Sequence, residues 1–136
     1  MEFKNKVIVI TGGAQGIGLE LANTFKKQHA HVCVIDCIEG DYFVGDVGNK
    51  EHLELFAKDV IQKYGHVDVL INNAPPQMKG INECSYEQFQ TALNVGVIAP
   101  FYLSKLFLPY FSQGASIINI SSSSGSNKKS YRIILA

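Results

Sequence analysis

Four glycines follow one another at close spacing in the segment Thr11–Gly18, which separates an apolar run from an amphipathic one. Backbone N–H groups at the start of a helix, together with the helix dipole, make a favourable site for a phosphate group. Glycines at the turn and at the helix entry let a pyrophosphate approach these N–H groups without meeting side chains. The residues expected to line this site are Gly12, Gln15, Gly16, Ile17 and Gly18. The pattern favours a dinucleotide-binding loop over the alternative, an ordinary tight turn.

An acidic residue, Asp36, ends the second apolar run and follows Gly18 by 18 positions. A carboxylate at this place accepts hydrogen bonds from the ribose hydroxyls of adenosine and repels a 2′-phosphate. Neither Gln15 in the glycine loop nor Cys37 after the acid supplies a cation to hold that phosphate. We therefore expect NAD(H) as the cofactor, with NADP(H) disfavoured; the alternative is a solvated carboxylate at a strand end.

Short apolar runs alternate with longer amphipathic segments along the chain, a pattern typical of parallel strands joined by helices. The expected strands are 7–10, 31–36, 41–47, 67–71 and 116–120. The expected helices are 17–27, 51–64 and 86–111, the last bent near Gly96 and Pro100. These elements predict a three-layer, doubly wound α/β fold with about five parallel strands in the order 3-2-1-4-5. The link after Asp36 is too short to hold a crossover helix.

The composition describes one globular domain. The chain has 136 residues, of which 46% are hydrophobic and 18% charged, and its formal net charge is zero. This balance argues against disorder, and the lack of basic excess argues against nucleic-acid binding. We expect a dinucleotide-binding domain at residues 1–126 and an irregular tail at 127–136.

The sequence also predicts the cellular compartment. No apolar run approaches the length of a membrane span, and the N-terminus lacks the apolar region of a signal peptide. The three cysteines are odd in number and form no paired framework or metal-ligand motif, as in a reducing compartment. We therefore expect a cytoplasmic protein with no membrane partner and no bound metal.

Further motifs stand at the ends of the later strands. They are the pair Asp46-Val47, the triplet Asn72-Asn73-Ala74 and the run Ile118-Asn119-Ile120-Ser121-Ser122, and they add to the segment TGGAQGIG after the first strand. Together they resemble the classical short-chain dehydrogenase/reductase family from about residue 3 to residue 125. The resemblance implies a Rossmann fold, a nicotinamide cofactor, and hydride transfer between that cofactor and a small alcohol or carbonyl substrate.

The resemblance also implies roles for individual residues. Gly12, Gly16 and Gly18 match the family's pyrophosphate loop, and Asp36 matches its NAD-selecting acid. The positions that match its adenine site are Asp46, for the adenine amine, and Val47, whose backbone meets the ring edge. The positions that match the segment beneath the cofactor are Asn73 and Ala74, and Ser122 matches the catalytic serine.

The sequence departs from the family pattern at two internal places. Pro75 and Pro76 follow Ala74 where the family usually has glycine, so we expect a reshaped wall at the cofactor ribose, with either bond a candidate for the cis form. Spacing places the family's catalytic asparagine at Gly96, and Asn94 would point nearly the opposite way on a helix. We interpret Asn94 as a surface or capping residue.

The family's catalytic pair, Tyr-x-x-x-Lys, has no counterpart in this sequence. The expected tyrosine position is Leu135, and Tyr131 has the uncharged Leu135 as its i+4 partner. We therefore expect a chain truncated before the family's catalytic helix and its sixth and seventh strands, and inactive alone. The alternatives are a non-catalytic dinucleotide-binding or interaction module, and an oxidoreductase completed by a partner chain.

The expected loss of these elements would uncover part of the long helix. Its apolar candidates for an exposed surface are Phe101, Leu103, Leu106, Phe107 and Phe111. Large exposed apolar patches usually mark an interface. We therefore expect a homo-oligomer that forms through the helix at 86–111.

Overall fold

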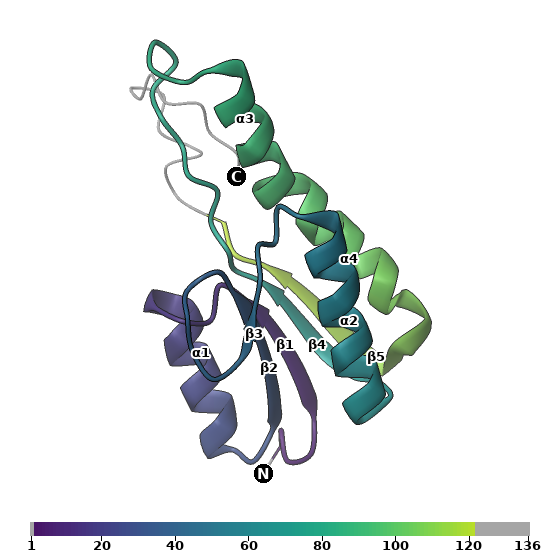
Figure 1. Cartoon of the computed structure of the whole chain (residues 1–136). Coiled ribbons are helices and arrows are strands. Elements are labelled where there is room, and N and C mark those ends of the chain that lie inside the picture. Colours follow the sequence, from purple (N-terminus) through teal and green to yellow (C-terminus); the bar gives the residue numbers. More distant parts are fainter. Residues whose placement is uncertain (1, 122–136) are drawn as a thin grey trace.

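A computed structural model describes residues 2–121 of the chain, in which five parallel strands form one sheet with the order β3-β2-β1-β4-β5 (Figure 1). The strands are β1 (Val7–Thr11), β2 (His31–Asp36), β3 (Phe43–Val44), β4 (Val67–Asn72) and β5 (Phe111–Asn119). The predicted fold class and strand order are confirmed. Ser122, Tyr131 and the expected domain boundary at residue 126 lie outside the described residues.

Helices cover both faces of the sheet. Helix α1 (Gly16–Lys27) lies on one face, and α2 (Lys50–Tyr64) lies on the other with a long helical stretch beside it (Figure 1). That stretch consists of α3 (Tyr86–Leu93), a π-helical turn (Asn94–Ile98), α4 (Ala99–Phe107) and a 3₁₀ turn (Leu108–Tyr110). The π turn contains Gly96, and Pro100 stands at the start of α4, so the expected irregularities occur within a continuous helix.

The strand side chains divide between two cores, as the alternation of a pleated strand requires. The core beneath α1 contains Ile8, Ile10, Ala22, Val34 and Ile71. The core beneath α2 and α4 includes Val7, Val9, Ile35, Phe56, Leu70, Leu103 and Phe107. Because β1 is fully buried on both faces, its apolar run without alternation is the pattern expected of a central parallel strand.

The third strand is shorter than the expected 41–47. Only Phe43 and Val44 form β3, and they pair with the last two residues of β2, Ile35 and Asp36. The Gly45 N–H donates to the Asp36 carbonyl at 2.9 Å, after which the chain turns toward α2. The link 37–42 contains no helix, as expected. The first half of β2 pairs with β1 on one side and, among the described residues, has no strand on its other side.

The long helix also differs from expectation in which side chains it exposes. Leu103 and Phe107 are 0% exposed because this face of α4 packs directly on the sheet and α2. Leu106 and Phe111 are half-buried against the same core, and of the five candidates only Phe101 is strongly exposed, at 64%. The exposed large hydrophobic residues of the stretch are Tyr86, Val97, Ile98, Phe101, Leu108 and Tyr110.

The whole stretch Tyr86–Tyr110 is long and apolar enough to cross a membrane, although its sequence holds no uninterrupted apolar run of that length. It is the single segment of that kind within residues 2–121, and core helices of soluble proteins pass the same test of length and composition.

A buried carboxylate joins three strands at the amino end of the sheet. Asp68 accepts hydrogen bonds from the Val7 N–H at 2.8 Å, from the Ser112 hydroxyl, and from His66 Nε2 at 3.0 Å. Lys6 adds an ion pair at 3.9 Å. Burial tends to raise the pKa of Asp68, but these hydrogen bonds and charges outweigh it and hold the pKa below its usual value. The ionised carboxylate is therefore the form that stabilises the fold.

Replacement of Phe107 by alanine should lower the free energy of unfolding by about 3–5 kcal/mol, because it removes a fully buried ring and leaves a cavity. Urea denaturation measures this change. Leu55→Ala, at a residue of α2 that is 57% exposed, should change it by no more than about 0.5 kcal/mol. Equal losses in the two variants would contradict the packing described.

Stability should fall in acid as Asp68 takes up a proton. Because its pKa is lower in the folded state than in the unfolded state, its contribution is complete above the unfolded pKa of about 3.9 and disappears as pH falls through the folded value. Asp68→Asn should cost about 1–3 kcal/mol at pH 7 and flatten the acid limb of the pH–stability curve. Asp59→Asn, which removes an exposed ion pair with Lys63, serves as the control and should cost under about 1 kcal/mol.

Candidate functional site

The glycine loop is fastened to the end of β4 by a network of hydrogen bonds. The Thr11 hydroxyl accepts from the N–H groups of Asn73 and Ala74, both at 3.0 Å. The Asn73 side-chain amide donates to the carbonyls of Thr11 at 3.2 Å and Gly12 at 3.0 Å. On the other side, the Gly12 N–H donates to the Ile35 carbonyl at 2.9 Å. The loop is thus held between β2 and β4, at the carboxyl end of the sheet.

Two glycines are required by this close packing. A Cβ on Gly12 would lie 2.9 Å from the Ala74 Cα, and its φ of +69° is rarely adopted by other residues. A Cβ on Gly18 would lie 2.2 Å from the Gly12 carbonyl oxygen and 2.5 Å from Asn73 Nδ2. The spaces next to these two residues are occupied by the loop and β4, so side chains there would displace the loop itself.

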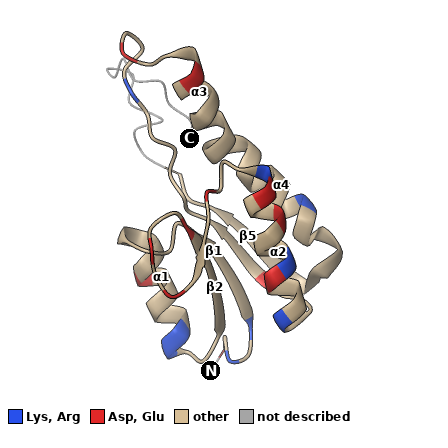
Figure 2. Cartoon of the chain, in the orientation of Figure 1, with Lys and Arg blue, Asp and Glu red and all other residues tan. Residues whose placement is uncertain are grey.

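Helix α1 begins at this loop with its first backbone N–H groups uncapped by side chains. Its N-cap residue, Gln15, makes no side-chain hydrogen bond to the helix, and the first turn contains no acidic residue. The basic residues Lys26 and Lys27 stand in the last turn, at the opposite end of the helix (Figure 2). The N-terminus therefore keeps its positive partial charge toward the loop, which suits an anionic ligand.

The carboxylate of Asp36 lies beside the loop. Asp36 is 8% exposed; its Oδ2 accepts from the Ala14 N–H at 3.0 Å, and its Oδ1 accepts from the Ile38 N–H at 3.2 Å. One carboxylate oxygen therefore contacts the glycine loop directly. Two of the expected features, the loop and the acid, are brought together in space.

The expected adenine residues follow β3. Asp46 is exposed, and its Oδ1 accepts from the Gly48 N–H at 2.8 Å, while Val47 is buried. The Asp46 N–H donates to Nδ1 of His52 at 2.9 Å, which holds the segment against the first turn of α2. The sequence patterns did not indicate this role for His52, because it depends on how the turn folds back on the helix.

Of the remaining expected positions, Pro75, Pro76 and Asn94 lie within the described residues. The bonds before Pro75 and Pro76 are trans, since residues 2–121 contain no cis peptide. Asn94 is half-buried and lines a cavity of about 250 Å³ with Val47, Gly48 and Tyr102, between α2 and the long helical stretch. Ser122, the expected catalytic serine, lies outside the described residues.

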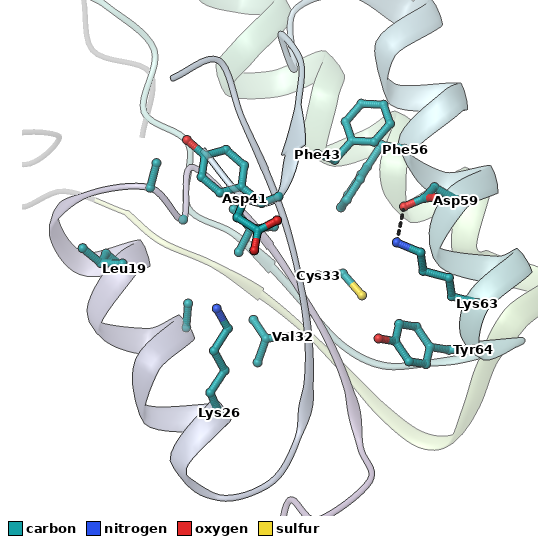
Figure 3. Close-up of a pocket in the computed structure, with 15 residues that line it drawn as sticks. Leu19, Lys26, Val32, Cys33, Asp41, Phe43, Phe56, Asp59, Lys63 and Tyr64 are labelled. Atoms are coloured by element: carbon teal, nitrogen blue, oxygen red, sulfur yellow. Dashed lines mark ion pairs between the residues drawn. The ribbon is translucent and has the colours of Figure 1, made fainter. Parts of the chain in front are cut away.

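A larger cavity, about 460 Å³, follows the edge of the sheet and reaches the glycine loop at Gly13 and Ala14 (Figure 3). It extends over both sides of β2, with Lys26 and Asp41 on the α1 side and Asp59 and Lys63 on the α2 side. The cavity exists because β3 pairs with only two residues of β2. Burial raises the pKa of Cys33, which lines it, to about 11, so this thiol is protonated at neutral pH and is a poor nucleophile.

Comparisons with known proteins agree with this geometry. A family model described as short chain dehydrogenase matches residues 6–133. L-fucose dehydrogenase from Mus musculus is 32% identical over 137 residues, which cover 88% of this chain and 50% of that protein. The chain spans about half the length of the curated relatives it matches.

Solved structures share the fold at similar identity. An apo SCOR enzyme from Clostridium thermocellum has 34% sequence identity and a TM-score of 0.84, over 93% of this chain and 57% of that one. The aldohexose dehydrogenase of Thermoplasma acidophilum, in ligand-free form, has 29% identity and a TM-score of 0.80, over 89% of this chain and 51% of that one. The family model covers nearly the whole sequence, and with these relatives it shows that the chain belongs to the short-chain dehydrogenase family.

Proposed function

We propose that this chain is the coenzyme-binding part of an NAD(H)-dependent oxidoreductase. The observation that carries the proposal is the close packing at Gly12 and Gly18, which leaves no room for a Cβ and holds the glycine loop at the uncapped start of α1. The residues present there fit a dinucleotide. Gly12, Gln15, Gly16, Ile17 and Gly18 would hold its pyrophosphate through their backbone.

The other residues would hold the adenosine and nicotinamide halves. The Asp36 carboxylate would accept hydrogen bonds from the ribose hydroxyls, and Asp46 with Val47 would contact adenine. Asn73 and Ala74 would form the floor beneath the coenzyme, in the position set by Thr11. When bound, the nicotinamide supplies hydride transfer between a small alcohol and its carbonyl, with Ser122 as the residue that would hydrogen-bond the substrate oxygen.

The preference for NAD(H) over NADP(H) is supported by charge. No lysine or arginine occurs between Lys27 and Lys50, whereas this stretch contains Asp36, Glu39, Asp41 and Asp46. A 2′-phosphate at the ribose would therefore meet carboxylates and no cation from the strand ends.

We propose further that the 136-residue chain binds coenzyme without turnover when alone. No tyrosine in its sequence is followed four residues later by lysine. The second candidate function, a non-catalytic dinucleotide-binding or interaction module, is favoured by this same observation. An oxidoreductase completed by a partner chain would differ from both in showing NADH formation only when that partner is added. L-fucose and aldohexoses are the first substrates to assay, since relatives are named for them.

We also propose a cytoplasmic location, with Tyr86–Tyr110 as a core helix. Ala99, Leu103 and Phe107 of this stretch are buried in the packed core, as the inner face of a globular helix requires. The exposed Val97, Phe101 and Leu108 recur along the opposite side and would join two copies of the chain.

Isothermal titration calorimetry with NADH tests the coenzyme site. The wild-type chain should bind NADH, and Gly18→Ala should lose at least about tenfold in affinity because the new Cβ pushes the Gly12 carbonyl and Asn73 away. Asp36→Asn, which leaves the glycines intact, should also weaken NADH binding and reduce the preference over NADPH.

Gly80→Ala is the matched control, since the nearest atom to its added Cβ is the flexible Glu83 carboxylate, away from the loop. Its affinity for NADH should equal that of the wild type. Absence of heat with the wild-type chain at millimolar NADH would refute the proposed function.

Sedimentation velocity tests the proposed association. The wild-type chain should sediment as a dimer or larger species, and Phe101→Glu should shift it to monomer, because a charge on this apolar face is costly to bury. Leu55→Glu, which changes an exposed leucine on α2, should leave the oligomer intact. A monomeric wild-type chain would contradict the proposal.

A further inference from the structure

The link 37–42 between β2 and β3 is short, yet it supplies one of the two hydrogen bonds that the Asp36 carboxylate accepts. The N–H of Ile38 donates to Oδ1 of Asp36 at 3.2 Å, and the N–H of Ala14 donates to Oδ2 at 3.0 Å. The glycine loop fixes Ala14 through its packing on β4. The Ile38 carbonyl is in turn held by a hydrogen bond from within the link.

Tyr42 performs this role. Its hydroxyl donates a hydrogen bond to the carbonyl of Ile38, four residues earlier. Its ring lies directly over Gly40, because a Cβ there would be 2.3 Å from ring carbon Cε1 and 2.7 Å from Cζ. The link therefore closes on itself, with glycine required at the place where the ring crosses the backbone.

The ring is also anchored outside the link. Tyr42 is half-buried and packs against the core beneath α1, to which Ala22 and Val34 belong. It thus fills part of the space that a crossover helix between β2 and β3 would cover. The chain of contacts runs from this core through the Tyr42 hydroxyl to Ile38, and from the Ile38 N–H to the carboxylate.

We infer that Tyr42 is a positioning residue for the Asp36 carboxylate and thereby sets the preference of this chain for NADH over NADPH, an inference that rests on the proposed function. Tyr42 would not touch the coenzyme; it would hold the carboxylate where ribose hydroxyls are accepted and a 2′-phosphate is repelled. Without it, the carboxylate keeps only its bond to Ala14 and can turn away.

The charges around the ring agree with this role. Burial and the neighbouring Asp36, Cys37 and Glu39 raise the pKa of Tyr42 above its usual value. The phenol therefore stays protonated and remains a hydrogen-bond donor at neutral pH. The link 37–42 contains no lysine or arginine that could replace the tyrosine near Asp36. Asp41, the residue before Tyr42, lines the open cavity with Lys26 (Figure 3).

The test is Tyr42→Phe, which keeps the ring and removes the hydroxyl. Calorimetric titrations with NADH and with NADPH give the two dissociation constants. The variant should bind NADH about fivefold more weakly, and its preference for NADH over NADPH should shrink by a similar factor, since one modest hydrogen bond is lost. Gly40→Ala should shift the preference in the same direction by displacing the ring.

Tyr102→Phe is the matched control. Its hydroxyl donates to Glu54 Oε2 at 3.1 Å on the surface of α2, away from Asp36, so both dissociation constants should stay at the wild-type values. If the wild-type chain binds NADH and Tyr42→Phe shows unchanged affinity and preference, the inference is overturned while the proposed function stands.

NMR spectra of the chain without coenzyme test the positioning role of Tyr42 independently of coenzyme binding. In ¹H–¹⁵N spectra, the Ile38 amide signal should move in Tyr42→Phe and stay in place in Tyr102→Phe. An unmoved Ile38 amide would overturn the positioning role whether or not coenzyme binds.

Discussion

The close approach of the glycine loop to the end of β4 is the constraint on which the site depends. Gly18 packs its Cα against the Gly12 carbonyl, and Asn73 donates to the carbonyls of Thr11 and Gly12. Side chains at the glycine positions would occupy the volume that these groups fill. The contact directs the first N–H groups of α1 toward the carboxyl edge of the sheet, where a dinucleotide pyrophosphate can reach them.

The two acidic residues of the candidate site, Asp36 and Asp46, are held by hydrogen bonds from turns. Asp36 is held by Ala14 on one side and Ile38 on the other, and the Asp46 N–H is held by His52. Asp36 ends β2, an inner strand, and Asp46 follows the edge strand β3, which has only two residues. Local hydrogen bonds therefore replace the rigidity that a longer strand and a crossover helix would give.

Local sequence patterns predicted those strands and helices whose structure depends mainly on their own residues. The continuous apolar runs at β1 and β2 and the amphipathic segments at α1 and α2 have the expected type and nearly the expected limits. The third strand was expected at 41–47, but strand length depends on how much of β2 lies opposite, which no local pattern records. Leu103 and Phe107 were expected on an exposed face for a similar reason, since the register of α4 on the sheet decides their burial.

The same distinction applies to the site. The spacing of the glycines and Asp36 predicts a coenzyme site, and that role stays a prediction. The structure shows that Asp36 accepts a hydrogen bond from Ala14 in the glycine loop. Thr11, Tyr42 and His52 were not foreseen, since each acts through one contact that exists only after the chain has folded.

The most direct test of the central claim is a ¹H–¹⁵N NMR titration of the chain with NADH and, separately, with ADP-ribose. If the loop amides bind the pyrophosphate, the largest shifts will fall on residues 12–18 and on Ile38, and they will be similar for both ligands. Shifts that avoid the glycine loop, or none at all at saturating ligand, would contradict the account.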